Sequence, residues 1–412
     1  MKVLEINAYH SRVGGAVTVY TNTTIGLKEA GHDVVNFTLK WDDNEASEFS
    51  KYFPESKDTR KGILRPVKNI ATYFYHKEAA KKLEKLIIDH KPDIAQIHLI
   101  WGQLSPSILP VLKKYNIPVI FTIHDYRIVC PNYLFLNGYG KVCEKCKGKN
   151  FYNCVKYKCC KNSRFLSVMM SAEQYFRNLF FHPAKYAQGI VYVSDFAKEI
   201  HEKYMPQLKN IPNIRLYNFH TKIESAPVAD KNDYFLFFGR LSREKGLDLL
   251  LKTFGRLPNL KLKIVGKGPY EEKVVNFIQN NNCTNIEFVG YKKGEELIDI
   301  IRKAYFTVVP SEWYENNPMT IIESYSVGTP VIGASIGGIP EIISENNTGF
   351  IFDNNDTSLQ SAVLRASQLS PKDYEKMCRN ALEYAQTNFG KEQYITKIVH
   401  FFQDVMKKNS GN

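Results

Sequence analysis

The sequence predicts an α/β protein with two doubly wound, Rossmann-like parallel-sheet domains that face each other across a cleft. Short apolar runs alternate with amphipathic stretches along most of the 412-residue chain, and this pattern is typical of parallel strands with helices on both faces of the sheet. The pattern is interrupted at residues 222–232, which are polar and contain a proline, so we interpret them as a linker. A chain of this length is long enough for two large cores.

The first domain is expected to span residues 1–221. Residues 3–8 form an apolar run that ends before Gly14 and Gly15, and a stretch with helical spacing follows and stops at Gly31. Further strands are predicted at 32–39, 94–99, 119–123 and 190–193, with a helix near 106–115.

The segment near residues 130–163 is aromatic, basic and rich in cysteine, and we interpret it as an insertion in the first domain. An amphipathic helix is predicted to follow over residues 164–181. Its apolar side is formed by Phe165, Val168, Met169, Ala172, Phe176 and Leu179. Such a helix either lies on a membrane surface or packs its apolar side on the core, and we favour the core.

The second domain is expected to span residues 233–388. Its strands are predicted at 234–238, 260–265, 286–289, 306–309 and 331–334, with helices between them. Residues 389–412 contain a last helix, which we expect to return to the first domain. In open sheets of this kind ligands bind beyond the carboxyl ends of the strands, so residues that follow strands are the candidates for a site.

The composition gives the net charge of the protein and indicates its cellular compartment. The chain carries a net charge of +13, and residues 1–221 hold 32 Lys and Arg against 19 Asp and Glu, so the excess lies in the first half. Its densest stretches are residues 57–68 and 141–164, and such a surface attracts acidic lipid, acidic glycan or nucleic acid. The opening residues do not resemble a signal peptide, and no apolar run reaches the roughly 18–20 residues of a membrane span. We therefore expect a cytoplasmic protein, with peripheral binding to the inner membrane face as an option.

Six of the eight cysteines lie between Cys130 and Cys160. The spacing of Cys143, Cys146, Cys154 and Cys159 is compatible with a structural zinc site of four thiolates. It is equally compatible with a reduced loop that holds no metal, because disulfides are disfavoured in the cytosol. Both interpretations stay open from the sequence.

The most informative motif is the segment from Glu315 to Glu323. Pro318 suits the first position of a helix, and the Asn317 side chain is expected to cap that helix. The amides of the first turn would then form an anion site. One carboxylate before this site and one on the helix would suit a sugar nucleotide, with Glu315 on sugar hydroxyls and Glu323 on a ribose diol.

Other residues that follow strands of the second domain also suit a nucleotide diphosphate. Arg240 and Lys245 form a short cationic loop that could hold two phosphates. Gly266 and Gly268, followed by Pro269, would let a base or a phosphate approach the backbone. The third glycine of the dinucleotide fingerprint is absent from this loop.

Together these pieces resemble the retaining family 4 glycosyltransferases of the GT-B fold, and in particular a cysteine-rich subset with His, Asp and Tyr before a Cys and Pro pair. The resemblance covers nearly the whole chain. It is carried by Gly14, Gly15 and Ala16, His124 and Asp125, residues 193–196, Asn218, residues 238–240, Lys245 and Gly246, residues 265–269, residues 288–291, Pro310 and Ser311, Glu315 and Glu323, residues 337–341 and residues 348–350.

The resemblance implies a role for each candidate. Among the candidate catalytic residues, Arg240 and Lys245 would neutralise the donor diphosphate, and Glu315 would hold the transferred sugar. His124 would contact that sugar near the reaction centre, and Asp125 would lie toward the acceptor.

Donor-binding roles are implied for ten residues. Gly14 and Gly15 would close over the diphosphate, the helix start would meet the phosphate or sugar, Glu323 would bind the ribose, and the glycine loop with Tyr291 would surround the base. The set is Gly14, Gly15, Gly266, Gly268, Pro269, Tyr291, Asn316, Asn317, Pro318 and Glu323. No cofactor is expected to be required for catalysis, since cations and helix amides can stabilise the leaving diphosphate.

The resemblance implies transfer of a sugar from a nucleotide donor, most commonly a UDP-sugar, to a glycan or lipid-linked glycan with retention of configuration. The expected setting is capsular, exopolysaccharide or other bacterial surface polysaccharide synthesis. Two alternatives stay open: a sugar-nucleotide epimerase of similar fold, and a zinc-containing basic protein that binds nucleic acid. The second leaves the phosphate-binding features unexplained, so no nucleic acid is expected.

Overall fold

The computed structural model of the chain describes residues 1–10, 14–56, 66–227 and 233–410. Contacts divide it into two compact units. Unit 1 comprises Met1–Tyr139, Cys143–Leu216 and Tyr394–Asn412, and unit 2 comprises Gly140–Val142 and Tyr217–Gln393. Most of the basic stretch at 57–68 and the last part of the expected linker, residues 228–232, lie outside the described residues.

Unit 1 contains a six-stranded sheet in the order β2-β1-β3-β4-β5-β6, and the pairs between neighbouring strands are parallel. Its strands are β1 (Lys2–Ile6), β2 (Asp33–Phe37), β3 (Ile94–Ile97), β4 (Val119–Ile123), β5 (Gly189–Tyr192) and β6 (Asn213–Arg215). Its helices are α1 (Gly15–Glu29), α2 (Pro66–Phe74), α3 (Lys77–His90), α4 (Leu109–Lys114), α5 (Tyr152–Lys156), α6 (Arg164–Phe180), α7 (Asp195–Tyr204) and α15 (Lys391–Ser410), which enters unit 1 at Tyr394.

Unit 2 also contains a six-stranded sheet of parallel pairs, in the order β12-β11-β10-β7-β8-β9. Its strands are β7 (Tyr234–Arg240), β8 (Lys261–Lys267), β9 (Ile286–Gly290), β10 (Phe306–Val309), β11 (Val331–Ala334) and β12 (Gly349–Phe352). Its helices are α8 (Leu247–Gly255), α9 (Glu271–Asn280), α10 (Gly294–Lys303), α11 (Met319–Ser326), α12 (Ile339–Ile342), α13 (Asp356–Ser367) and α14 (Pro371–Asn388).

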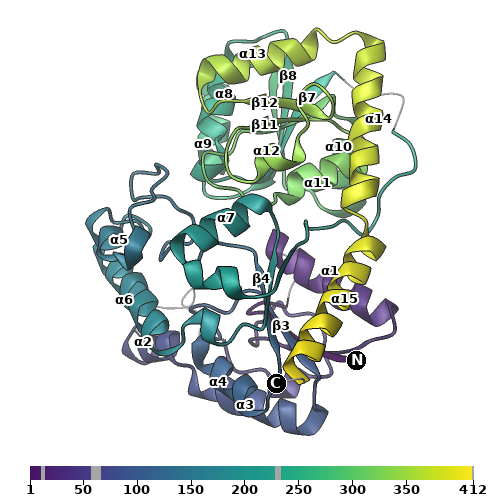
Figure 1. Cartoon of the computed structure of the whole chain (residues 1–412). Coiled ribbons are helices and arrows are strands. Elements are labelled where there is room, and N and C mark those ends of the chain that lie inside the picture. Colours follow the sequence, from purple (N-terminus) through teal and green to yellow (C-terminus); the bar gives the residue numbers. More distant parts are fainter. Residues whose placement is uncertain (11–13, 57–65, 228–232, 411–412) are drawn as a thin grey trace. The chain divides into compact units, whose positions relative to one another are not determined.

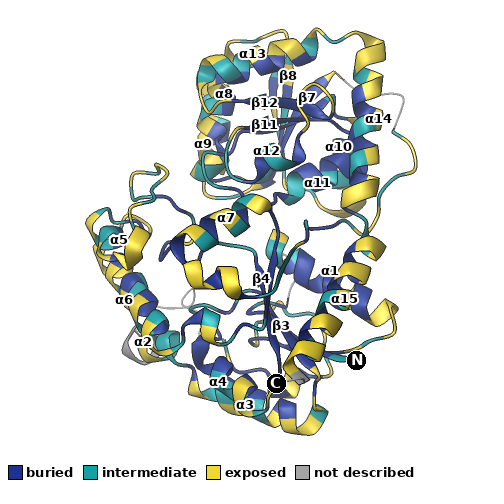
Figure 2. Ribbon diagram, in the orientation of Figure 1, coloured by how far each residue is buried: buried dark blue, intermediate teal, exposed yellow. Residues whose placement is uncertain are grey.

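Each unit has its helices on both faces of its own sheet (Figure 1). The central strands are therefore buried on both faces, as Figure 2 shows for both sheets, whereas the edge strands β6 and β9 are only partly buried. In β4 and β10 every residue is buried, and such continuous apolar strands are typical of parallel sheets. The predicted fold class, two doubly wound parallel-sheet domains, is confirmed.

One helix differs from its prediction. The apolar side of α6 does not pack on the core, because Phe165, Val168 and Leu179 are exposed. The buried residues of this helix are polar instead. Hydrophobic periodicity identified the helix and its apolar side, but the favoured interpretation of where that side faces was wrong.

Candidate functional site

The strand order of unit 2 creates a place for a ligand. The chain runs outward from β7 through β8 to β9, then returns to start again at β10 on the other side of β7. At such a switch point the loops after the two central strands diverge and leave a crevice at the carboxyl ends of the strands. Arg240 is the last residue of β7, and Pro310 directly follows β10.

A buried carboxylate joins the two loops at this switch point. Glu315, which follows β10, is 5% exposed, and its Oε1 accepts a hydrogen bond of 2.7 Å from Lys245 Nζ, which follows β7. The same oxygen accepts from Ser311 Oγ at 2.7 Å and from Trp313 Nε1 at 2.9 Å. Two predicted site residues distant in sequence are thus in direct contact.

The backbone around Glu315 is held by a glycine. The amide of Gly338 donates to the Glu315 carbonyl oxygen at 2.7 Å. Gly337 has a φ of +61°, and a Cβ built there would lie 2.4 Å from that oxygen. Only glycine combines this conformation with so close an approach, so Gly337 fixes where the carboxylate is presented.

Arg240 is oriented differently from Lys245. Its side chain is exposed and forms an ion pair with Glu244, four residues later in the same loop. Glu244 also accepts from Ser242 Oγ at 2.8 Å. Both predicted phosphate-binding cations therefore have carboxylate partners in this structure, and a diphosphate would compete for Arg240 at the surface and for Lys245 beside Glu315.

The start of α11 is built from a different hydrogen bond than predicted. Pro318 occupies the N-cap position, no side chain caps the helix, and Met319 is its first residue. The Asn317 Oδ1 instead accepts from the backbone amide of Asn218 at 2.7 Å, and Asn218 Nδ2 donates to the Asn317 carbonyl at 2.9 Å. The predicted Asn317 cap is wrong because Asn218, which is distant in sequence, takes that oxygen. Asn316 is buried beside it.

Glu323 lies on α11 and is half-buried. Burial raises the pKa of its carboxyl to about 7. A carboxylic acid with such a pKa changes charge near neutral pH. The strength of its hydrogen bonds to bound hydroxyl groups would therefore depend on pH in that range.

The glycine loop after β8 is shaped by its neighbour β7. A Cβ at Gly266 would lie 1.9 Å from the Gly239 carbonyl oxygen, and one at Gly268 would lie 2.3 Å from the Leu241 carbonyl oxygen. These glycines are therefore needed for close strand packing as well as for any approach of a ligand. Pro269 follows them before α9, and Tyr291, after β9, is 50% exposed with Lys267 Nζ 4.2 Å from its ring centroid.

In unit 1 the predicted His124 belongs to a chain of three side chains. Oε2 of Glu5, on β1, forms a hydrogen bond of 2.9 Å with His98 Nε2, and His98 Nδ1 forms one of 2.8 Å with His124 Nε2. The two imidazoles stack with centroids 5.1 Å apart. Glu5 is fully buried and His98 is 3% exposed.

Burial decides the protonation states of these three side chains. It raises the pKa of Glu5 and lowers the pKa of His98 to about 3. Burial, with the neighbouring His98, also lowers the pKa of His124. When all three groups are neutral, a proton on Glu5 Oε2 donates to His98 Nε2, and His98 Nδ1–H then donates to His124 Nε2. In this assignment the proton of His124 resides on Nδ1.

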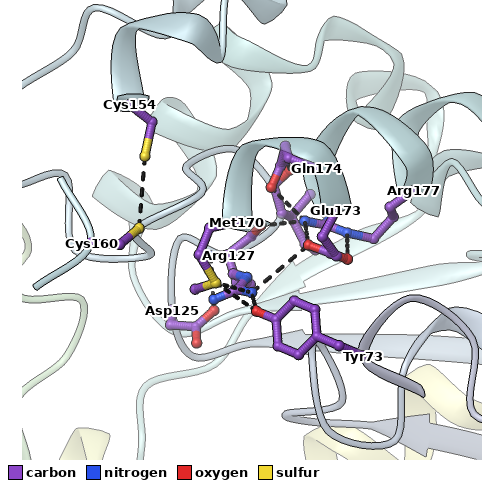
Figure 3. Close-up of polar contacts among 10 residues, drawn as sticks. Tyr73, Asp125, Arg127, Cys154, Cys160, Met170, Glu173, Gln174 and Arg177 are labelled. Atoms are coloured by element: carbon purple, nitrogen blue, oxygen red, sulfur yellow. Dashed lines mark hydrogen bonds and ion pairs between the residues drawn. The ribbon is translucent and has the colours of Figure 1, made fainter. Parts of the chain in front are cut away.

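Asp125 is held by a second network (Figure 3). Its Oδ1 accepts from the backbone amide of Arg127 at 2.9 Å. The Arg127 guanidinium lies 3.8 Å from Glu173, and Glu173 pairs with Arg177 at 2.9 Å. Burial raises the pKa of Asp125, and the nearby Arg127 opposes that rise. The carboxyl is thus held by the backbone of Arg127, and α6 in turn holds Arg127.

The predicted glycines Gly14 and Gly15 lie at the start of α1. Gly14 is the N-cap residue with a φ of +99°, and in the described parts of the chain no atom lies within 4 Å of where its Cβ would be. Both are exposed. Residues 11–13, which precede them, lie outside the described residues.

The cysteines of the insertion come together in part. Cys154, Cys159 and Cys160 form a buried cluster with Cys146 beside it, and the Sγ atoms of Cys154 and Cys160 are 3.7 Å apart. A hydrogen bond with Cys159 lowers the pKa of Cys143 to about 6. Among the described residues, no group of three or more His, Cys, Asp or Glu side chains is arranged to hold a metal ion. The zinc site stays a prediction.

Glu5, His98 and Gly337 are the residues that sequence reasoning missed. Glu5 interrupts the apolar run at 3–8, and His98 interrupts the one predicted at 94–99, so both carried a signal. Their contact depends on the pairing of β1 with β3, which the sequence pattern does not specify.

No helix in the described parts of the chain has the length and apolarity needed to cross a membrane.

Two family models match consecutive parts of the chain. Residues 13–214 match Glycosyltransferase Family 4, and residues 218–385 match Glycosyl transferases group 1. The sequence is 26% identical to an uncharacterised glycosyltransferase of Methanocaldococcus jannaschii over 371 residues, with 88% of each chain covered. It is 24% identical over 360 residues to a 42.6 kDa protein in the cps region of Klebsiella pneumoniae, covering 83% of this chain and 87% of that protein.

Solved structures share the fold. A sucrose-phosphate synthase of Thermosynechococcus elongatus superposes with a TM-score of 0.72 at 18% identity and 99% coverage of both chains. HepE of Anabaena in complex with UDP-glucose superposes with a TM-score of 0.64 at 14% identity, covering 98% of this chain and all of that one.

Proposed function

Because the chain belongs to the family 4, group 1 glycosyltransferases of the GT-B fold, and is therefore a nucleotide-sugar-dependent transferase, we propose that it uses a UDP-sugar and retains the configuration of the transferred sugar. The acceptor we propose is a glycan or lipid-linked glycan of a bacterial surface polysaccharide. The UDP-glucose complex of a protein with the same fold supports the donor, and a relative from a cps region supports the setting.

The single observation that carries the proposal is the contact between Lys245 and Glu315 at the switch point of unit 2. A diphosphate needs a cation, and a sugar needs hydrogen-bond acceptors close to that cation. Lys245 supplies the first and Glu315 the second, 2.7 Å apart. Arg240 adds a second cation from the same loop.

These side chains act on the leaving group. When the bond between the anomeric carbon and the phosphate oxygen breaks, negative charge grows on the diphosphate. Lys245 and Arg240 stabilise that charge more than the charge of the ground state, because fixed cations need little reorganisation. We propose that these cations, without a bound metal, supply the charge, and transfer should then persist in the presence of a chelator.

Retention follows when the acceptor attacks the face that the leaving group departs from. The acceptor oxygen bonds to the anomeric carbon, the bond to the phosphate oxygen breaks, and the acceptor proton passes to that phosphate oxygen. No protein nucleophile is then needed. Neutral His124 donates a hydrogen bond to the sugar, Asp125 orients the acceptor, and Gly14 and Gly15 provide backbone amides for the diphosphate.

Nucleoside recognition completes the donor site. Glu323 binds the ribose diol, and the loop of Gly266, Gly268 and Pro269 surrounds the base together with Tyr291. The buried backbone of Asn316, Asn317 and Pro318 positions the start of α11 beside the phosphate. The enzyme is proposed to work in the cytoplasm, where nucleotide sugars are made.

A donor panel tests the proposal. Purified protein is incubated with UDP-, GDP-, ADP- and dTDP-sugars, with and without a lipid-extract acceptor, and released nucleotide and anomeric configuration are measured by chromatography and NMR. We expect release of UDP that increases with acceptor and a product of unchanged anomeric configuration. An inverted product would overturn retention, release from another nucleotide alone would overturn the donor, and an epimerised donor formed without acceptor would overturn transfer.

A further inference from the structure

Helix α6 packs with its polar side inward. The residues it buries are Ser167, Ser171, Glu173, Gln174 and Arg177. Three of them bind backbone carbonyls of neighbouring segments: Ser171 Oγ donates to Phe151 at 3.0 Å, Gln174 Nε2 to Ile128 at 2.6 Å and Arg177 Nη2 to Arg127 at 2.8 Å. Figure 3 shows Glu173, Gln174 and Arg177 directed toward Arg127. Hydrogen bonds therefore fix which side of the helix faces the protein.

The opposite side of α6 is apolar and exposed. We define the α6 outer face as Phe165, Leu166, Val168, Tyr175, Leu179 and Phe180, whose exposed fractions range from 36% to 69%. Phe165, Val168, Tyr175 and Leu179 recur at helical spacing and share one stripe. In Figure 2 this helix is largely coloured as exposed.

Rotation of the helix cannot hide this face. Glu173 and Arg177 are both fully buried and paired at 2.9 Å, and the Arg177 guanidinium lies 4.4 Å from the Trp101 ring centroid. Turning α6 would break a buried ion pair and several hydrogen bonds, which costs more than exposing a few apolar side chains. A contiguous exposed apolar face of this kind marks a surface that binds something.

The charge around the α6 outer face is positive. Residues 141–185 contain ten Lys and Arg and two Glu. Both glutamates are engaged, since Glu144 pairs with Lys203 at 2.6 Å and Glu173 pairs with Arg177. Lys161 and Arg164 are exposed at the start of the helix, and Lys185 is exposed after its end.

We propose that the α6 outer face docks on a lipid bilayer that contains anionic lipids. Aromatic and aliphatic side chains on one side of a helix with basic residues at its borders are the features of a helix that lies in the membrane interface. The basic residues then meet the negative headgroups. A second copy of the chain fits poorly, because it would bring the same positive surface against itself. The α6 outer face belongs to unit 1 and shares no residue with the donor site proposed in unit 2, so the inference goes beyond the transfer reaction.

Vesicle flotation of the full-length protein tests the docking surface. The probes are vesicles of phosphatidylcholine alone and of phosphatidylcholine mixed with phosphatidylglycerol, each at low and high salt. The variant is the double substitution Phe165→Glu and Leu179→Glu, which places two charges on exposed positions. The control is Ile88→Glu, because Ile88 is similarly exposed, at 53%, on α3 of the same unit.

We expect the wild-type protein and Ile88→Glu to float with the acidic vesicles and to lose binding at high salt. The double variant should bind at least about tenfold more weakly, since charged residues do not enter the interface. The inference is overturned when the wild type does not float, when the double variant binds as the wild type does, or when scattering shows that the outer face instead joins two copies of the chain. Flotation requires no donor, so its result is separate from that of the transfer assay.

Discussion

Replacement of Glu315 by glutamine isolates the charge of the carboxylate that we place beside the donor sugar. The amide oxygen of glutamine still accepts the hydrogen bonds from Ser311 and Trp313, so the local structure should persist. What disappears is the negative partner of Lys245, 2.7 Å away, and the negative acceptor for sugar hydroxyls. Glu315→Ala is a poorer test, because it leaves the Lys245, Ser311 and Trp313 donors without their common acceptor.

The expected magnitudes follow from these contacts. Hydrogen bonds to a charged group contribute about 1.5–3 kcal/mol each. Two such bonds to the sugar, made more strongly in the transition state, contribute about 3–6 kcal/mol, and their loss corresponds to a fall in kcat/KM of about 10²–10⁴. The loss of unfolding free energy should be only about 1–2 kcal/mol, because the Lys245 side chain is 23% exposed and can reach water.

The assay measures kcat/KM for the donor together with urea unfolding for the wild type, Glu315→Gln and a control. Glu383→Gln removes an exposed carboxylate from α14 and should change neither quantity by more than about 0.5 kcal/mol. A folded Glu315→Gln enzyme that keeps kcat/KM within about threefold of the wild type would refute our assignment of this carboxylate.

Four further outcomes are expected. Gly337→Ala should destabilise the protein by at least about 2 kcal/mol more in urea unfolding than Gly294→Ala, since both positions have φ near +60° but only the first Cβ meets backbone; equal losses would contradict this. UDP affinity should rise as pH increases through about 7 because Glu323 ionises, and calorimetry should show no such rise for Glu323→Gln. Glu5→Gln, which can still donate to His98, should retain the Nδ1–H tautomer of His124 in ¹⁵N NMR, whereas Glu5→Leu should lose it; loss in both would refute the neutral assignment. Metal analysis of protein purified without chelator should find about one zinc per chain if Cys143, Cys146, Cys154 and Cys159 bind it as predicted, and absence of zinc would reject that set.

Strand positions were predictable because a buried parallel strand is apolar along its length. The predicted strands at 306–309 and 331–334 coincide with β10 and β11. The location of the candidate site was also predictable, since Arg240, Lys245 and Glu315 all follow strands and the carboxyl ends of parallel strands share an edge of the sheet.

The hydrogen-bond partners were not predictable from spacing. Asn317 had the side chain of a helix cap, but Asn218 lies close enough to take its oxygen. Glu5 and His98 meet only because β1 pairs with β3. Pairing across a sheet depends on strand order, which periodicity along one strand does not encode.

The orientation of α6 has a similar explanation. Its apolar periodicity predicts an amphipathic helix but does not say which side faces the core. The buried Arg177 decides the orientation, because it pairs with Glu173 and donates to the Arg127 carbonyl. In the sequence alone, these two charged residues predict a side that faces solvent.

We propose that unit 2 binds a donor diphosphate through Lys245 and Arg240. Equilibrium titration of UDP and of uridine into the wild type and into Lys245→Gln tests it most directly. We expect UDP to bind the wild type, uridine to bind at least about tenfold more weakly, and Lys245→Gln to lose about tenfold or more in UDP affinity with little change for uridine. Equal affinities for UDP and uridine, or unchanged UDP affinity in the variant, would contradict the claim.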